Sequence, residues 1–198
     1  TFLETVSPEL PPVSSDYKGT WLSLYRETLE KRATFLADVP FSDMAAYKAI
    51  LERTPTPYHI QISNSAPIRY AQLFPAKAGW QVFCNRGTSG IDGSTSTAIG
   101  ASVVQSTPTL LITGDLSFFY NSNALWCNYI PKNLKIIVVN NAGGGIFRIL
   151  PTDKGTPFFE TFQETTHSLT AKHLCAMYGF TYLCAQNQEE LTKTLETF

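Results

Sequence analysis

One stretch decides the fold of this chain, residues 109 to 145: TLLITGDLSFFYNSNALWCNYIPKNLKIIVVNNAGGG. Two short apolar, β-branched runs in it, Thr109 to Thr113 and Leu134 to Val139, are typical of strands buried on both faces of a parallel sheet. The segment between them, Ser117 to Ile130, carries spaced apolar residues and ends before Pro131, so it predicts a crossover helix. Strand, helix and strand together predict a right-handed βαβ unit.

Both predicted strands end in residues that can bind a ligand. Asp115 follows the first strand, and Asn141 follows the second, just before the glycine run 143–145. Taken singly, each pattern is common in an ordinary turn, but together they fall at the carboxyl ends of parallel strands, where such sheets bind ligands. Mg²⁺ prefers oxygen ligands. The pattern predicts a divalent cation that holds a diphosphate, bound by Asp115, Asn141 and a backbone carbonyl near Gly143.

The rest of the chain alternates strands and helices, which predicts a doubly wound α/β domain with a mostly parallel sheet. Further strands are expected at Tyr58 to Ser63, Trp80 to Cys84 and Phe180 to Ala185, and helices at Trp21 to Leu36, Ser42 to Leu51, Ser94 to Val104, Ser168 to Tyr178 and Gln188 to Phe198. Pro151 to Thr166 reads as a long irregular segment. The proline-containing segment Thr1 to Ser15 is expected to be a linker or tail.

Composition limits the possible partners. The 15 basic and 16 acidic residues balance, and no Lys/Arg block occurs, which argues against binding to nucleic acid or to anionic membranes. No stretch has the pattern of a membrane span or a signal peptide. The four cysteines form no zinc or Cys-x-x-Cys spacing, so we expect buried, reduced thiols in a cytoplasmic protein. His59, His167 and His173 fit no catalytic motif and are expected to be structural or solvated.

An ordinary nucleotide-binding domain is the alternative on physical grounds. The chain has neither Gly-x-Gly-x-x-Gly after a strand nor Gly-x-x-x-x-Gly-Lys-Ser/Thr, so the motifs of such domains are missing.

Four blocks carry a resemblance to a known family. The Gly114-Asp115 and Asn140-Asn141 pair resembles the metal and diphosphate motif of thiamin diphosphate enzymes, although Leu116 replaces its usual third residue, Gly. Three further blocks, residues 64–69 (NSAPIR), 85–93 (NRGTSGIDG) and 143–151 (GGGIFRILP), are similar to the 2-succinyl-5-enolpyruvyl-6-hydroxy-3-cyclohexene-1-carboxylate (SEPHCHC) synthase family of menaquinone biosynthesis. The match is dense from about Tyr58 to Pro151.

The resemblance implies roles for individual residues. Ser65 and Arg69 would bind the distal carboxylate of 2-oxoglutarate, and Arg86 would be an active-site cation. Ile91 matches the apolar wedge that bends the cofactor. Arg148 is expected to face solvent. The remaining implied contacts are apolar wall residues beside the reacting carbons, Ile146, Phe147 and Leu150, and cofactor contacts, Gly90, Gly114, Asp115, Leu116, Ser117, Asn141, Gly143 and Gly144.

The resemblance also implies a reaction and its partners. The family uses thiamin diphosphate with Mg²⁺ or Mn²⁺ to decarboxylate 2-oxoglutarate and add the product to isochorismate. Its subunits form homodimers or homotetramers, and a carboxylate from the N-terminal domain of a second subunit completes each site. We therefore expect residues 40–198 to be the C-terminal cofactor domain, residues 1–39 to lead from a missing domain, and the chain alone to be inactive.

Two other functions stay open from the sequence. The chain could be the cofactor domain of another thiamin diphosphate enzyme, of the acetolactate synthase or 2-oxoacid decarboxylase type; the block at 85–93 and Leu116 speak against this. It could also be a non-catalytic binding or assembly module.

Overall fold

The computed structural model describes residues 4, 5, 8 and 14–198, and these fall into two compact units, Thr1–Pro40 and Phe41–Phe198. Helix α2 (Tyr17–Asp38) makes up most of the described part of the first unit, and none of its residues is buried. It extends slightly beyond both predicted ends. The expected linker over Thr1 to Ser15 falls largely outside the described residues.

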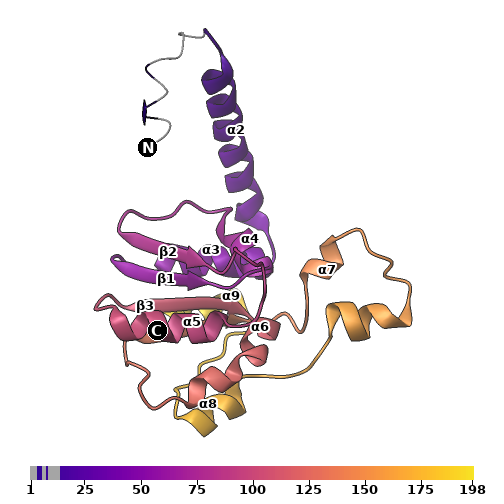
Figure 1. Cartoon of the computed structure of the whole chain (residues 1–198). Coiled ribbons are helices and arrows are strands. Elements are labelled where there is room, and N and C mark those ends of the chain that lie inside the picture. The colour runs from indigo at the N-terminus through magenta and orange to yellow at the C-terminus, as the bar shows by residue number, and fades with distance from the viewer. Residues whose placement is uncertain (1–3, 6–7, 9–13) are drawn as a thin grey trace. The chain divides into compact units, whose positions relative to one another are not determined.

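The second unit is built on a four-stranded parallel sheet, which confirms the predicted fold class (Figure 1). The strands are β1 (Tyr58–Ile62), β2 (Trp80–Cys84), β3 (Thr109–Gly114) and β4 (Leu134–Val139), in the order β2-β1-β3-β4. β3 lies between two strands and is buried from Thr109 to Thr113. The expectation of burial on both faces is wrong for β4, which is half-buried beyond Leu134 because it has one neighbouring strand.

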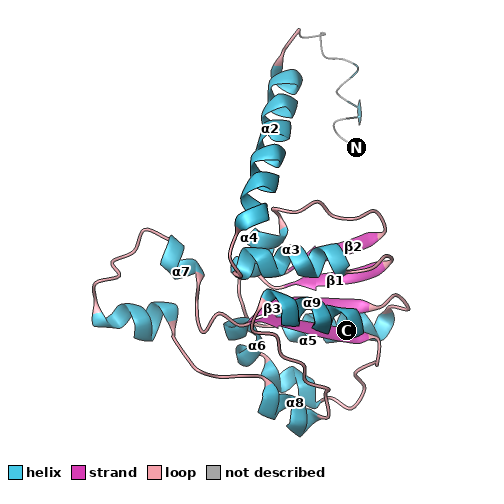
Figure 2. Ribbon diagram, turned by 180° about the vertical axis from the view of Figure 1, so that it is seen from behind, coloured by secondary structure: helices cyan, strands magenta, loops and turns pink. Residues whose placement is uncertain are grey.

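Helices cover both faces of the sheet (Figure 2). On one face lie α3 (Asp43–Arg53), α4 (Ala66–Ala71) and α9 (Gln188–Thr197), which pack on Ile60, Ile62, Leu110 and Ile112. On the other lie α5 (Ser94–Val104), α6 (Asp115–Tyr120), the 3₁₀ helix η2 (Ser122–Trp126) and α8 (Lys172–Tyr178). Burying apolar side chains on both faces is what fixes the sheet between its helices.

The crossover between β3 and β4 differs from the predicted continuous helix over Ser117 to Ile130. Helix α6 begins earlier, at Asp115, and ends at Tyr120, and η2 follows. The break lies at Asn121, whose side-chain oxygen accepts hydrogen bonds from the backbone N–H and the hydroxyl of Ser96, at 2.7 and 2.9 Å. These bonds tie the chain to α5 instead of letting the helix continue.

Two further expectations are wrong. Residues Phe180 to Ala185 form no strand, because the backbone N–H of Phe180 bonds Cys175 and its ring packs on the core of the α8 face, outside the sheet. The cysteines are free, as expected, but they are not buried: three are half-buried and Cys184 is exposed. Among the described residues, no helix has the length and apolarity that crossing a membrane requires.

Residues 142–167 form an arm that leaves the sheet after β4 and returns before α8 (Figure 1). The arm contains α7 (Ile146–Ile149) and the π-helix η3 (Phe159–Glu164), so the segment expected to be irregular contains a short helix. Two backbone hydrogen bonds join the two ends of the arm at its base. The N–H of Gly144 donates to the carbonyl of Glu164 at 2.6 Å, and the N–H of His167 donates to the carbonyl of Ala142 at 3.2 Å.

Candidate functional site

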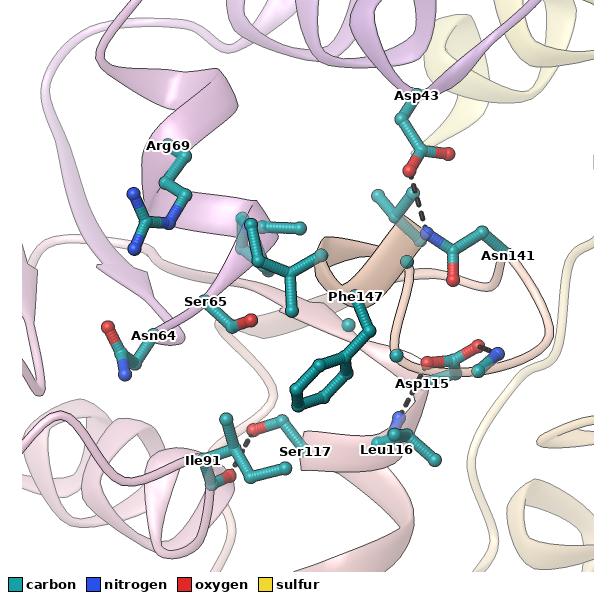
Figure 3. Close-up of a pocket in the computed structure, with 18 of the residues that line it drawn as sticks. Asp43, Asn64, Ser65, Arg69, Ile91, Asp115, Leu116, Ser117, Asn141 and Phe147 are labelled. Atoms are coloured by element: carbon teal, nitrogen blue, oxygen red, sulfur yellow. Dashed lines mark hydrogen bonds between the residues drawn. The ribbon is translucent and has the colours of Figure 1, made fainter. Parts of the chain in front are cut away.

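A cavity of about 440 Å³ opens where β1, β3 and β4 end. The polar groups predicted from separate sequence blocks meet in it, together with the apolar residues of the arm (Figure 3). Every predicted site residue except Gly90 lines it: Ser65, Arg69, Arg86, Ile91, Gly114, Asp115, Leu116, Ser117, Asn141, Gly143, Gly144, Ile146, Phe147 and Leu150. Gly90 shapes the neighbouring turn, where a Cβ atom would lie 2.5 Å from the Asp92 carboxylate.

Asp115 lies at the junction of β3 and α6 and is buried. Its Oδ1 accepts a hydrogen bond from the backbone N–H of Leu116 at 2.7 Å, and its Oδ2 accepts one from Gly143 at 2.9 Å. A carboxylate has about four lone-pair positions, so Oδ1, with one hydrogen bond, keeps room for a further partner. The structure therefore holds the Asp115 carboxylate in one orientation without saturating it.

His167 adds a contact that the sequence did not reveal. Its Nε2 lies 3.3 Å from Oδ2 of Asp115, and its ring meets Phe119 edge-on at 5.4 Å. Its Nδ1 accepts a hydrogen bond from the backbone N–H of Leu169 at 3.1 Å, whereas Nε2 is buried and has no hydrogen-bond partner among the described residues. No motif marks His167, because only the return of the arm brings it to the site.

Asn141 follows β4 and is half-buried at the opposite side of the cavity from Ser65 (Figure 3). Its Nδ2 donates a hydrogen bond to Oδ2 of Asp43 at 2.7 Å. Asp43 stands at the start of α3 and also lines the cavity. No sequence motif marks Asp43, since it precedes Asn141 by 98 residues and belongs to no recognised block.

The glycine run packs too tightly for side chains. Gly143 has φ of +147°, and a Cβ there would lie 2.8 Å from the Glu164 carbonyl oxygen; both features require glycine. The backbone N–H of Gly143 binds Asp115, whereas its carbonyl, the predicted metal ligand, accepts a hydrogen bond from Gly145 at 2.9 Å. That carbonyl still has a second lone pair.

Arg148 is exposed, as expected, but it also has two polar partners. Its Nε pairs with the carboxylate of Glu164, which is buried, and its Nη2 donates to the backbone carbonyl of Asn141 at 3.2 Å. Its side chain is 46% exposed, so one end of the guanidinium is in water while the other compensates a buried charge. The pair joins the two ends of the arm.

Two cations line the other end of the cavity. Arg86 donates from Nη1 to Oδ1 of Asn64 at 2.7 Å, and the Nδ2 of Asn64 donates to the backbone carbonyl of Ser89. Asn64 is buried and so fixes the guanidinium of Arg86 against the wall. Arg69, on the last turn of α4, is exposed and points toward Asn64 (Figure 3). This end is suited to carboxylates, which arginine binds with two parallel hydrogen bonds.

The apolar residues of the site come from the 85–93 loop and from the arm. The backbone carbonyl of Ile91 accepts a hydrogen bond from the Ser117 hydroxyl, which ties the 85–93 loop to α6. Phe147 lies in the middle of the view, between Ser65 and Asp115 (Figure 3). Ile146 and Leu150 line the same wall. The cavity is therefore apolar at its centre and polar at both ends, as small-molecule sites usually are.

The buried side chain of Tyr47 indicates which kind of ligand the polar end of the cavity near Asp115 can bind. Its side chain is 1% exposed, and its hydroxyl has no hydrogen-bond partner within the described part of the chain. Burial, then Asp43, Tyr70 and Asp115, raise its pKa well above the usual value. A buried hydroxyl needs a partner, and this one lines the cavity beside a carboxylate and an amide. Carboxylate and amide oxygens are ligands that suit a hard cation, which can bind phosphate oxygens at the same time.

The fold and this site define a thiamin diphosphate-binding domain. Residues 65–198 match the family described as "Thiamine pyrophosphate enzyme, C-terminal TPP binding domain", and the chain belongs to that family. The crystal structure of benzoylformate decarboxylase from Polynucleobacter necessarius has the same fold, with a TM-score of 0.60 over 81% of this chain and 31% of that chain, at 16% identity.

The sequence relatives are more specific. The chain is 51% identical over 195 residues to the 2-succinyl-5-enolpyruvyl-6-hydroxy-3-cyclohexene-1-carboxylate synthase of Flavobacterium psychrophilum, covering 98% of this chain and 36% of that protein. It is 42% identical over 198 residues to the synthase of Porphyromonas gingivalis, covering 99% of this chain and 34% of that protein. The chain thus spans about a third of the length of these curated relatives.

Proposed function

We propose that this chain is the cofactor-binding part of a SEPHCHC synthase, an enzyme of menaquinone biosynthesis that decarboxylates 2-oxoglutarate on thiamin diphosphate and joins the product to isochorismate. The observation that supports the proposal is the cavity at the sheet edge, which has Asp115, Asn141 and the glycine run at one end, Arg69 and Arg86 at the other, and apolar residues between them. The relatives are named as synthases of the product of this reaction.

In this proposal the residues of the cavity have separate roles. Asp115, Asn141 and the Gly143 backbone would hold Mg²⁺ and, with Gly114, Leu116, Ser117 and Gly144, the diphosphate. When bound, thiamin diphosphate supplies the electron sink for decarboxylation. Ile91 would be the apolar wedge that supports the bent conformation of the cofactor. The contacts described above fix Asp115 and Ser117 before any ligand arrives, which lowers the cost of binding.

The other end of the cavity would select the substrates. Both 2-oxoglutarate and isochorismate carry two carboxylates, and Arg69 and Arg86 are the cations that face this end of the cavity. Ser65 and Arg69 would bind the distal carboxylate of 2-oxoglutarate. Ile146, Phe147 and Leu150 would exclude water from the reacting carbons. Arg86, held by Asn64, would meet a second carboxylate.

The same proposal includes a partner domain and an assembly. The pyrimidine end of the cofactor would be covered by an N-terminal domain of a second subunit in a homodimer or homotetramer, which would also supply the missing catalytic carboxylate. A cytoplasmic location agrees with the four free thiols. The chain alone should therefore release no carbon dioxide from 2-oxoglutarate, and release that is lost in Asp115→Ala would contradict this.

Calorimetry tests the cofactor site directly. Thiamin diphosphate with Mg²⁺ is titrated into the chain and into Asp115→Ala and Asn141→Ala. Binding that requires the metal and both side chains supports the proposal. Binding that survives both substitutions would mean that the diphosphate binds elsewhere. In a second experiment, mixing the chain with the N-terminal domains of a relative should restore activity if the chain supplies the cofactor site.

A further inference from the structure

Asp43 and Asn141 are joined by a side-chain hydrogen bond across one rim of the cavity. The Nδ2 of Asn141 lies 2.7 Å from Oδ2 of Asp43, and the amide oxygen of Asn141 points away from Asp43, to the side where Asp115 lies (Figure 3). Asp43 comes from the first turn of α3, while Asn141 follows β4. Two elements on different parts of the unit therefore meet at this bond.

The bond decides which end of the amide faces the cavity. An ionised carboxylate can only accept hydrogen bonds, whereas an amide side chain has a donating and an accepting end. The NH₂ group must therefore turn toward Asp43, and Oδ1 must turn the other way. Without Asp43, the flipped amide would present two N–H groups to a cation, which cannot coordinate them.

The surroundings of Asn141 leave it little freedom. A Cβ atom at Gly145 would lie 2.6 Å from Nδ2 and 3.3 Å from Cγ of Asn141, so the amide packs directly on the Gly145 backbone. Arg148 holds the Asn141 carbonyl at 3.2 Å. The backbone of Asn141 is fixed from one side and its amide from another, and within the described ranges Asp43 is the hydrogen-bond partner that distinguishes the two ends of that amide.

Asp43 is itself held in place. Ser42 caps α3, accepting a hydrogen bond from the backbone N–H of Ala45, and an acidic residue in the first helical turn is favoured by the helix dipole. One turn later, the buried Tyr47 stacks on Tyr70 with ring centroids 5.4 Å apart. The start of α3 is thus a rigid support for the carboxylate.

We infer that Asp43 is a positioning residue of the cation site: it orients Asn141 so that Oδ1 faces the bound metal. The inference deepens the proposed function and rests on it for the identity of the ligand. The hydrogen bond at its centre is tested without any ligand.

The first test observes the amide itself. In ¹H–¹⁵N spectra, the side-chain NH₂ signals of Asn141 are identified by their loss in Asn141→Asp. Asp43→Ala should move them to higher field, since the charged acceptor is gone, while Glu189→Gln should leave them in place. Glu189 is the matched control because it also lies in a first helical turn, that of α9. Unchanged Asn141 signals in Asp43→Ala would overturn the inference.

The second test measures the metal. The Mg²⁺ concentration that half-saturates thiamin diphosphate binding should rise about 10–100-fold in Asp43→Ala and in the isosteric Asp43→Asn, as for other outer-shell residues of metal sites. Glu189→Gln should match the unsubstituted chain. Unchanged metal dependence in both Asp43 variants, with the fold intact by circular dichroism, overturns the inference. Failure of the unsubstituted chain to bind the cofactor counts against the proposed function alone, because the amide signals still decide the Asp43–Asn141 link.

Discussion

The carboxylate of Asp115 and the backbone N–H of Gly143 are joined by a hydrogen bond of 2.9 Å that links the ends of β3 and β4. The bond is buried, and it is charge-assisted, a class that is stronger than a bond between neutral groups. It means that the proposed metal ligand also holds the glycine run in place. Substitutions at either end should thus affect both the cofactor and the arm.

Asp115→Ala should weaken Mg²⁺-dependent binding of thiamin diphosphate by about 100-fold or more, beyond the effect usual for outer-shell residues, because a ligand is lost and Gly143 loses its acceptor. Calorimetry with and without Mg²⁺ measures the change. Asp153→Ala is the control, since the Asp153 carboxylate is exposed and serves its own turn through Gly155. Equal affinity in the two variants would contradict the proposed site.

Gly143→Ala should destabilise the second unit by about 1–3 kcal/mol, since a side chain at φ +147° is strained and its Cβ would meet the Glu164 carbonyl. Urea unfolding gives the difference. Gly100→Ala is the contrasting variant: Gly100 lies inside α5 with open space around it, so alanine should stabilise by about 0.5–1 kcal/mol. A Gly143→Ala chain as stable as the parent would show that the arm docks differently.

Arg148→Met should destabilise the arm by roughly 1–2 kcal/mol, the lower range for a hydrogen bond to a charged group, because Arg148 is half exposed. It leaves the buried Glu164 carboxylate without its cation. The double variant Arg148→Met, Glu164→Met should recover much of the loss, as when a buried pair is replaced by apolar side chains. Limited proteolysis of residues 149–158 and urea unfolding provide the measurements, and additive losses would argue against the pair.

Tyr47→Phe should be neutral or stabilising at pH 7, since the hydroxyl is buried and has no hydrogen-bond partner among the residues that the structure describes. Burial raises the pKa of Tyr47 above its usual value, so the folded state keeps the proton more firmly than the unfolded state. Stability from this group is complete below about pH 10 and is lost as the pH rises toward the folded pKa. Tyr47→Phe should reduce that alkaline loss.

Unfolding measured between pH 8 and 11 tests this. Tyr120→Phe, at a site 63% exposed, serves as the control and should leave the alkaline slope unchanged. Some slope should remain in Tyr47→Phe, because burial also raises the pKa of Tyr70. An identical slope in Tyr47→Phe and the parent chain would show that Tyr47 ionises freely in the folded state.

The sequence was a good guide where local pattern and topology agree. β-branched runs and strand-end polar residues predicted β3, β4 and the edge at which Asp115 and Asn141 meet. It failed at two places where other hydrogen bonds decide: Asn121, bound to Ser96, ends α6 early, and the backbone N–H of Phe180 is bound to the carbonyl of Cys175. Asp43 and His167 reach the site only through folding, since neither lies in a motif.

The hydrogen bonds at the base of the arm bear on how the sequence of the arm can vary between related proteins. Backbone hydrogen bonds join residues 142–144 to residues 164–167 at the base of the arm. Insertions and substitutions between these two segments need not disturb the sheet or the residues at the ends of β3 and β4. The apolar wall formed by Ile146, Phe147 and Leu150 can thereby vary separately from the ends of β3 and β4. Substitutions in this one segment would alter the wall proposed to face the substrates and leave the proposed cation ligands Asp115 and Asn141 in place.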